Sequence, residues 1–204
     1  MCSSDLESME TLSRAMYGTI EAITKTVETR DPYTAGHQKK VADIAKEIAK
    51  DMGLKRDIIE SVNLAGQIHD LGKIAIPAEI LNKPGRINEI EFALIKTHSQ
   101  MGYDILKNID FPWPIADIVL QHHEKFNGTG YPNGIMGEDI LVQARIIAVA
   151  DVLEAMASHR PYRAALGIDI AFEELLKNKG THFDPGVVDS CIRLFKEKGF
   201  KVNF

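Results

Sequence analysis

Five histidines and two aspartates in this sequence have the types and spacing of a metal site. They are His37, His69, Asp70, His98, His122, His123 and Asp151. Imidazole and carboxylate groups are ligands that iron, manganese, nickel and zinc accept. Seven such groups exceed the four that a single structural zinc uses, so two metal ions are predicted if all seven converge. Two neighbouring metal ions are well suited to the attack on a phosphate ester.

Asp151 lies in an almost continuously apolar segment, ARIIAVADVLEAMAS (residues 144–158), which is typical of a buried helix. A lone carboxylate there would cost several kcal/mol or take up a proton, so it needs a cation. Arg145 is poorly placed for this role, because neighbours on a helix face lie three or four residues apart. A metal ion is one candidate partner and an arginine from another helix is the other, and this segment alone does not decide between them.

Three of the histidines lie on the apolar stripes of different predicted helices. His69 follows Val62 and Ala65, His98 follows Phe92 and Ile95, and His37 precedes Val41. A single histidine on an apolar face is more often a core residue than a ligand, but three on separate helices favour convergence.

Adjacent histidines and aspartates can share one cluster. His69 and Asp70 lie about 100° apart on a helix, so one could bind a metal terminally while the other bridges two metals. His122 and His123 have the same relation at a helix end. We expect the two remaining histidines, His159 and His182, to be structural or to lie on the rim of a pocket.

The composition sets limits on the class of protein. The chain has 204 residues, of which 45% are hydrophobic and 26% charged, as expected for one globular domain. Its formal net charge of −5 argues against binding to polymeric nucleic acid. It has no apolar run of the roughly 20 residues that cross a bilayer and no secretory signal. Cys2 and Cys191 form no disulfide or CxxC pattern, so a cytoplasmic location is expected.

Period-3.6 patterning runs through nearly the whole chain and predicts an all-α fold, a compact multi-helix bundle with a long N-terminal helix. The helices are expected at residues 4–30, 37–52, 56–71, from Asn88 onward, from 111–114 to 123, and at 140–158, 168–178 and 184–199. Asn88 and Glu91 form a capping-box pattern, and Asp184 with Pro185 is a typical helix start. Loops are expected around Pro77, Pro84 and Gly85 and at residues 127–137.

The N-terminal helix begins before a compact domain would need it. We therefore treat residues 1–18 as a signalling or dimerising extension and residues 19–204 as the domain. The extension suggests a homodimer or an upstream sensory domain in a longer protein. The alternative is that the helix simply packs on the domain.

With these residues in view, the chain resembles the HD-GYP domain, a branch of the HD superfamily of metal-dependent phosphohydrolases. The matching segments are DPYTAGHQKKVA (31–42), HDLGKIAIP (69–77), ILNKPGRI (80–87), HHEKFNGTGYPNGIMG (122–137), ARIIAVADVLEAMASHRPYR (144–163) and FDPGVV (183–188). A His-Asp pair alone would be weak evidence for this family, but the ordered set of segments, with Gly130-Tyr131-Pro132 after the double histidine, is specific to it.

The resemblance implies hydrolysis of cyclic di-GMP to pGpG, and in some members onward to GMP. It assigns one metal to His37, His69 and Asp151, the other to His98, His122 and His123, and a bridging role to Asp70. It also implies that Lys73 points at the site and that Arg160 and Arg163 meet substrate phosphate. Tyr131 could stack on the substrate or donate a hydrogen bond.

Two positions depart from the family pattern. Tyr33 replaces a glutamate that in some members supports a third metal, so two metals are expected here. Lys125 replaces the arginine of HHER, which keeps the charge but loses the bidentate fork. Because an exposed lysine there could be merely solvated, we expect a modest effect.

The expected mechanism is attack of a metal-bridging hydroxide on phosphorus, with Asp70 and Lys73 as catalytic residues and Lys73 also contacting substrate. Iron and manganese are favoured, and nickel and zinc also accept this donor set. Two rival hypotheses remain. One is a hydrolase of another cyclic dinucleotide, such as mixed cyclic GMP-AMP. The other is a non-catalytic domain that binds cyclic di-GMP or a partner protein.

Overall fold

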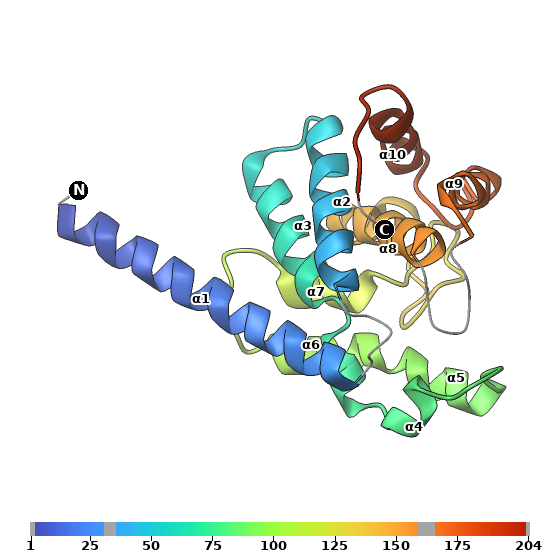
Figure 1. The fold of residues 1–204 in the computed structure, drawn as a ribbon, viewed down its shortest axis with the longest axis horizontal. Coiled ribbons are helices and arrows are strands. Elements are labelled where there is room, and N and C mark those ends of the chain that lie inside the picture. Colours follow the sequence, from blue (N-terminus) through green and yellow to red (C-terminus); the bar gives the residue numbers. More distant parts are fainter. Residues whose placement is uncertain (1–2, 31–35, 159–165, 203–204) are drawn as a thin grey trace.

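The computed structural model describes residues 3–30, 36–158 and 166–202 (Figure 1). These residues form helices and connecting segments without any strand, which confirms the predicted all-α class. None of these helices is both long and apolar enough to cross a membrane.

The helix bounds follow the predicted order closely. The helices are α1 (Ser3–Arg30), α2 (His37–Asp51), α3 (Arg56–Ile68), α4 (Ala78–Leu81), α5 (Glu89–Lys96), α6 (His98–Leu106), α7 (Ile115–Gln121), α8 (Val142–Ala157), α9 (Ile168–Lys177) and α10 (Pro185–Lys196). Short 3₁₀ helices lie at Leu71–Ala75 and Gly137–Asp139.

Helix α8 lies at the centre of the bundle, where α2, α3, α7, α9 and α10 contact it (Figure 1). Its apolar residues cover most of its circumference, so it must be surrounded by other helices. Ile146, Ile147, Val149 and Leu153 are completely buried. Asp151 therefore lies on a helix whose position is fixed by packing on several sides.

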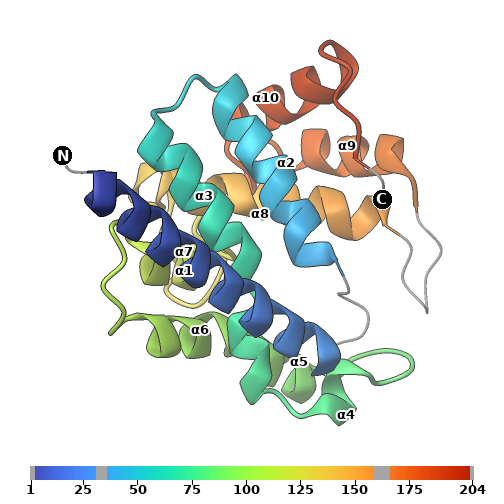
Figure 2. The same cartoon turned by 60° about the vertical axis from the view of Figure 1, so that its left-hand side comes forward.

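Helix α1 lies across the bundle, and its N-terminal end projects beyond the other helices (Figures 1 and 2). Its C-terminal half is anchored: Ile20 and Val27 are buried, and the Thr24 hydroxyl donates to the Gln67 carbonyl at 3.0 Å. The Arg30 guanidinium donates to the Ile74 carbonyl at 2.7 Å. This half of α1 thus packs on the segment that contains His69 and Asp70.

Three local differences from the predicted helices concern the path of the chain near the site. Helix α3 ends at Ile68 rather than near residue 71, and a tight 3₁₀ turn follows at Leu71–Ala75. The loop expected around Pro77 contains the short helix α4. The helix that begins after Asn88 ends at Lys96, so His98 starts a new helix, and Phe92 is half-exposed rather than inward-facing.

Close backbone approach explains the tight turn after α3. A Cβ atom at Gly72 would lie 1.8 Å from the His98 carbonyl oxygen and 2.6 Å from the Gly102 nitrogen. Only glycine lets the two backbones approach this closely. This contact brings the segment of His69 and Asp70 next to the start of α6, where His98 lies.

The predicted caps are confirmed. Asn88 accepts a hydrogen bond from the Glu91 nitrogen, and the Glu91 carboxylate accepts from the Asn88 nitrogen, which completes the capping box. The Asp184 side chain caps the start of α10 by accepting hydrogen bonds from the Gly186 and Val187 nitrogens, and Pro185 is the first residue of that helix. Such caps satisfy backbone donors that a helix leaves unpaired at its start.

Candidate metal centre

The structure brings six of the seven predicted ligand residues together as two groups, and the seventh, Asp151, contacts His37. His98, His122 and His123 form one group, and His37, His69 and Asp70 form the other. In each group the candidate ligand atoms lie within 4.8 Å of one another. The residues come from separate elements: His37 begins α2, His69 follows α3, His98 begins α6, and His122 follows α7.

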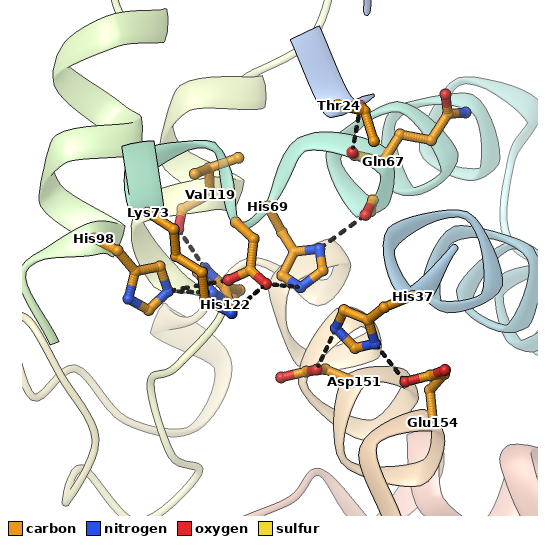
Figure 3. Close-up of polar contacts among 12 residues, drawn as sticks. Thr24, His37, Gln67, His69, Lys73, His98, Val119, His122, Asp151 and Glu154 are labelled. Carbon is orange, nitrogen blue, oxygen red and sulfur yellow. Dashed lines mark hydrogen bonds and ion pairs between the residues drawn. The ribbon is translucent and has the colours of Figure 1, made fainter. Parts of the chain in front are cut away.

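The imidazole rings form a connected row. The ring centroids of His37 and His69 are 5.6 Å apart, those of His69 and His122 are 5.2 Å apart, and those of His122 and His98 are 5.2 Å apart. Figure 3 shows this row, with His98 at one end and His37 at the other.

Backbone carbonyls fix the orientation of three of these rings. The Nδ1 atom of His69 is 2.8 Å from the Gly66 oxygen, that of His98 is 2.7 Å from the Ile95 oxygen, and that of His122 is 2.5 Å from the Val119 oxygen. A carbonyl oxygen only accepts, so Nδ1 must donate in each case. This leaves the Nε2 atom of each ring directed toward the cluster, as in metal-binding histidines, where the lone pair of Nε2 binds the metal.

The Nε2 atoms have no satisfactory hydrogen-bond partner in the part of the chain that the structure describes. Nε2 of His69 is buried and has no hydrogen-bond partner among the described residues. Nε2 of His98 and Nε2 of His122 lie 3.2 Å apart, and each ring already directs its Nδ1 proton to a backbone carbonyl. Burial lowers the pKa of both residues, so both rings are neutral and their lone pairs repel. A cation would relieve this repulsion, so the residues present fit a metal site.

Asp70 belongs to the group of His37 and His69 and also faces the group of His98, His122 and His123. Its Oδ1 is 3.5 Å from Nε2 of His98, and its Oδ2 is 3.6 Å from Nε2 of His69 and 2.7 Å from Nζ of Lys73. Burial opposes its charge, but Lys73 and the surrounding imidazoles hold its pKa well below the usual range. An ionised carboxylate that faces both groups is suited to bridge two cations.

His37 is held between two carboxylates of α8. Its Nε2 lies 3.2 Å from Oδ1 of Asp151, and its Nδ1 hydrogen-bonds Glu154 (Figure 3). Burial alone would lower the pKa of His37, but the hydrogen bonds to Asp151 and Glu154 raise it to about 9. Arg145, the nearest arginine along α8, pairs with Asp184 instead.

Glu154 was missed by the sequence analysis. It is buried and accepts a hydrogen bond from the Ser158 hydroxyl at 2.5 Å, which leaves its other oxygen for Nδ1 of His37. Carboxylates of this kind orient metal-binding histidines and make them better ligands. The signal was present in the sequence, because Glu154 is a second acidic residue one turn after Asp151 in the same apolar helix.

The glycine-rich loop at residues 127–137 lies over the group formed by His98, His122 and His123. The Tyr131 ring centroid is 4.8 Å from that of His123, and burial with the nearby aspartates raises the pKa of Tyr131, so it stays protonated. A Cβ atom at Gly130 would lie 2.5 Å from the Cα of Glu124, so only glycine fits. The buried Glu124 carboxylate accepts from the Asn133 nitrogen at 2.7 Å and anchors the loop.

A cavity of about 400 Å³ opens beside the cluster. His122, His123 and Asp151 form one side of it, and Lys125 and His182 are among its other lining residues. Lys125 is thus partly buried in the cavity wall rather than freely solvated, and His182 lies at the pocket as expected. The predicted residues Tyr33, His159, Arg160 and Arg163 lie outside the described residues.

Comparison with known proteins identifies the family. The model of a family described as "HD domain" matches residues 21–187. The cyclic di-GMP phosphodiesterase response regulator RpfG of Xanthomonas campestris is 37% identical over 92% of this chain and 50% of its own length. The 3'3'-cGAMP-specific phosphodiesterase 3 of Vibrio cholerae is 36% identical over 81% of this chain and 36% of its own length. The chain thus spans half or less of the length of these relatives.

A solved structure shows the same fold. The cyclic GMP-AMP-specific phosphodiesterase V-cGAP3 of V. cholerae superimposes with a TM-score of 0.70 at 19% identity, over 88% of this chain and 48% of that one. The chain belongs to the HD domain family, in agreement with the resemblance found in its sequence.

Proposed function

From this membership of the HD domain family, we propose that the chain is a metal-dependent phosphodiesterase that hydrolyses cyclic di-GMP to pGpG or onward to GMP. The observation that carries the proposal is the pair of neighbouring ligand groups, with the Asp70 carboxylate facing both, beside a cavity of about 400 Å³. Two neighbouring groups of metal ligands that share one carboxylate are suited to two-metal hydrolysis of a phosphodiester.

The relatives support the choice of substrate. The Xanthomonas relative, which is 37% identical, is named as a cyclic di-GMP phosphodiesterase. The Vibrio relative named as specific for 3'3'-cGAMP is 36% identical, so mixed cyclic GMP-AMP is the second candidate substrate. A non-catalytic binding domain is disfavoured, because mere binding would not need the full set of inward-facing ligand atoms.

We assign one metal ion to His37, His69 and Asp151 and the other to His98, His122 and His123, with Asp70 bridging. Bound there, iron or manganese would activate water and neutralise charge on the phosphate, and nickel or zinc would also fit the donor set. Glu154 would orient His37, and the carbonyls of Gly66, Ile95 and Val119 would orient the other rings.

The remaining assigned residues act on substrate. Lys73, beside Asp70, would place positive charge next to the phosphate that is cut. The Tyr131 hydroxyl, which stays protonated, would donate a hydrogen bond to substrate, and its ring would lie against a base. Arg160 and Arg163 would bind substrate phosphate, as the family resemblance implies.

The organisation around the site is also a proposal. We assign residues 19–204 to the catalytic domain and residues 1–18 to an extension that joins an upstream sensory domain or pairs with a second copy. The buried free thiol of Cys191 suits the reducing cytoplasm in which we expect the protein to act. Deleting residues 1–18 and measuring the oligomeric state in solution tests the dimer, since an unchanged state would contradict it.

The test of function begins with metal-stripped protein reloaded separately with manganese and with iron(II) under anaerobic conditions. Each form is incubated with cyclic di-GMP and with mixed cyclic GMP-AMP, and the nucleotides are separated by chromatography. We expect pGpG or GMP from cyclic di-GMP. If only mixed cyclic GMP-AMP is hydrolysed, it is the substrate in place of cyclic di-GMP. If the protein binds two metal ions but forms no product from either nucleotide, a non-catalytic binding domain is favoured.

A further inference from the structure

The cavity beside the metal centre continues well beyond the metal ligands. Apart from the ligand residues and the neighbouring Glu124 and Lys125, its lining residues come from three elements: Ala148, Val152 and Met156 of α8, Glu174 of α9, and His182 and Phe183 from the turn before α10. The side chains of Val152, Met156 and Phe183 make this part of the wall apolar, while Glu174 adds a carboxylate. We call this set of α8, α9 and turn residues the distal wall.

Glu174 is held in place and has hydrogen-bonding capacity to spare. Its Oε1 accepts from Nδ2 of Asn178 at 2.7 Å, one turn further along α9. Its Oε2 has no hydrogen-bond partner in the part of the chain that the structure describes. An ionised carboxylate accepts through both oxygens and donates nothing, so this group selects a ligand with N–H donors.

The rest of the distal wall is fixed by backbone hydrogen bonds. Asn178 also accepts, through its carbonyl oxygen, from the nitrogens of Thr181 and His182 at 3.1 and 2.9 Å. The His182 carbonyl accepts from the Phe126 nitrogen at 3.0 Å, which joins the turn to the segment after His123. The wall is therefore preorganised, with Asn178 connecting the Glu174 side chain to the turn.

We propose that the distal wall is a guanine-binding subsite in which the Glu174 carboxylate accepts hydrogen bonds from N1–H and the 2-amino group of a purine base. Val152, Met156 and Phe183 then cover the faces of the base. The inference deepens the proposed function, on which it rests, because it names the base that the site prefers.

The chemistry of the two purines supports this choice. Guanine presents two adjacent N–H donors on one edge, which match the two oxygens of a carboxylate. Adenine has an unprotonated N1 at the same position, and this lone pair would face the negative charge of Glu174. Glu174 is partly exposed in the free protein, and a bound base would shield its carboxylate from water, so the mismatch with adenine favours guanine.

The direct test measures the affinity of GMP, IMP and AMP for the metal-loaded protein by calorimetry. IMP keeps N1–H but lacks the 2-amino group, so the expected order of affinity is GMP, then IMP, then AMP. The variant Glu174→Gln removes the charge with little change in shape. It should weaken GMP binding about tenfold to a hundredfold and bring GMP and AMP close together, because hydrogen bonds to a charged group are worth about 1.5–3 kcal/mol.

Glu173→Gln is the matched control, since Glu173 is the exposed neighbour on the same helix and does not line the cavity. It should keep the wild-type order of affinities. Equal binding of GMP and AMP by the wild type, or equal behaviour of the two variants, would overturn the proposal.

A base-free substrate separates this inference from the proposed function. Hydrolysis of bis(4-nitrophenyl) phosphate should be the same in wild type and Glu174→Gln, while KM for cyclic di-GMP rises in Glu174→Gln alone. If the wild type binds GMP in the expected order but does not cut cyclic di-GMP, the function fails and the subsite stands. If wild type and Glu174→Gln hydrolyse cyclic di-GMP at the same rate and with the same KM, the proposed function stands and the proposed guanine subsite is wrong.

Discussion

Two buried aspartates in this molecule have opposite surroundings. Asp51, at the end of α2, has a side chain that is 1% exposed and pairs with Arg193 and Lys198 while accepting from the Ser190 hydroxyl at 2.6 Å. Asp70 has a side chain that is 4% exposed and lies among histidines, with Lys73 as the one cation paired with it among the described residues. We call the first set (Asp51, Ser190, Arg193, Lys198) the Asp51 cluster.

The difference indicates that the charge of Asp51 has a structural role, whereas that of Asp70 is suited to bind a ligand. In the Asp51 cluster the protein supplies the balancing cations, whose own side chains remain 42% and 56% exposed. Around Asp70 the histidines donate outward to carbonyls and direct their lone pairs inward. The first arrangement is complete within the chain, and the second requires cations from outside.

The largest expected contrast is in turnover. Asp70→Asn should reduce hydrolysis of cyclic di-GMP by about a thousandfold or more, because metal-based stabilisation of charge is worth several kcal/mol. Asp51→Asn, the same change in the other buried aspartate, should leave turnover per folded molecule unchanged. Steady-state rates measured on folded protein of both variants, with exposed Asp117→Asn as control, test this contrast. Equal loss in both buried variants would remove the distinction.

A smaller effect is expected at Glu154, which hydrogen-bonds the ligand residue His37 but is not itself assigned to a metal. Glu154→Gln should lower metal affinity or activity by about tenfold to a hundredfold, because it loses the negative partner that orients His37. Titration of the metal-free protein with manganese measures this affinity. Unchanged affinity would mean that Glu154 only packs against His37.

The free energy of unfolding should depend on Asp51, the aspartate that is not expected to affect turnover. Asp51→Asn should lower the free energy of unfolding by about 2 kcal/mol, since it replaces charged hydrogen bonds that join α2 to α10. Denaturant unfolding of metal-free wild type and variant measures the difference. A stability equal to that of the wild type would show that the exposed cations contribute nothing to the Asp51 cluster.

The smallest effect concerns pH. Burial would raise the pKa of Asp51, but Lys198, Ser190 and Arg193 hold it below the usual 3.8. A lowered pKa in the folded state stabilises the protein above pH 3.8 and loses this contribution as pH falls further. The stability gap between wild type and Asp51→Asn should therefore be constant near neutral pH and shrink below about pH 4. A gap that widens on acidification would contradict this assignment.

Much of the architecture was predictable because short-range signals set it. The capping box at Asn88 and the Asp184-Pro185 start gave helix ends that the structure confirms. The ligand residues could be singled out because polar groups at apolar positions need a partner.

The features that could not be predicted depend on tertiary contact. The break between α5 and α6 places His98 at a helix start, and the approach of Gly72 to the His98 carbonyl is visible only in three dimensions. The role of Glu174 likewise depends on α9 packing beside α8. Glu154 is different, since its spacing from Asp151 could have revealed it.

The most direct test of the account is the number of metal ions per folded chain after reconstitution, measured by elemental analysis for wild type, His69→Asn and Asp51→Asn. The account predicts two ions in the wild type, fewer in His69→Asn, and two in Asp51→Asn despite its lower stability. Absence of bound metal in the wild type, or an equal loss in both variants, would contradict the claim that the histidine cluster is a two-metal centre.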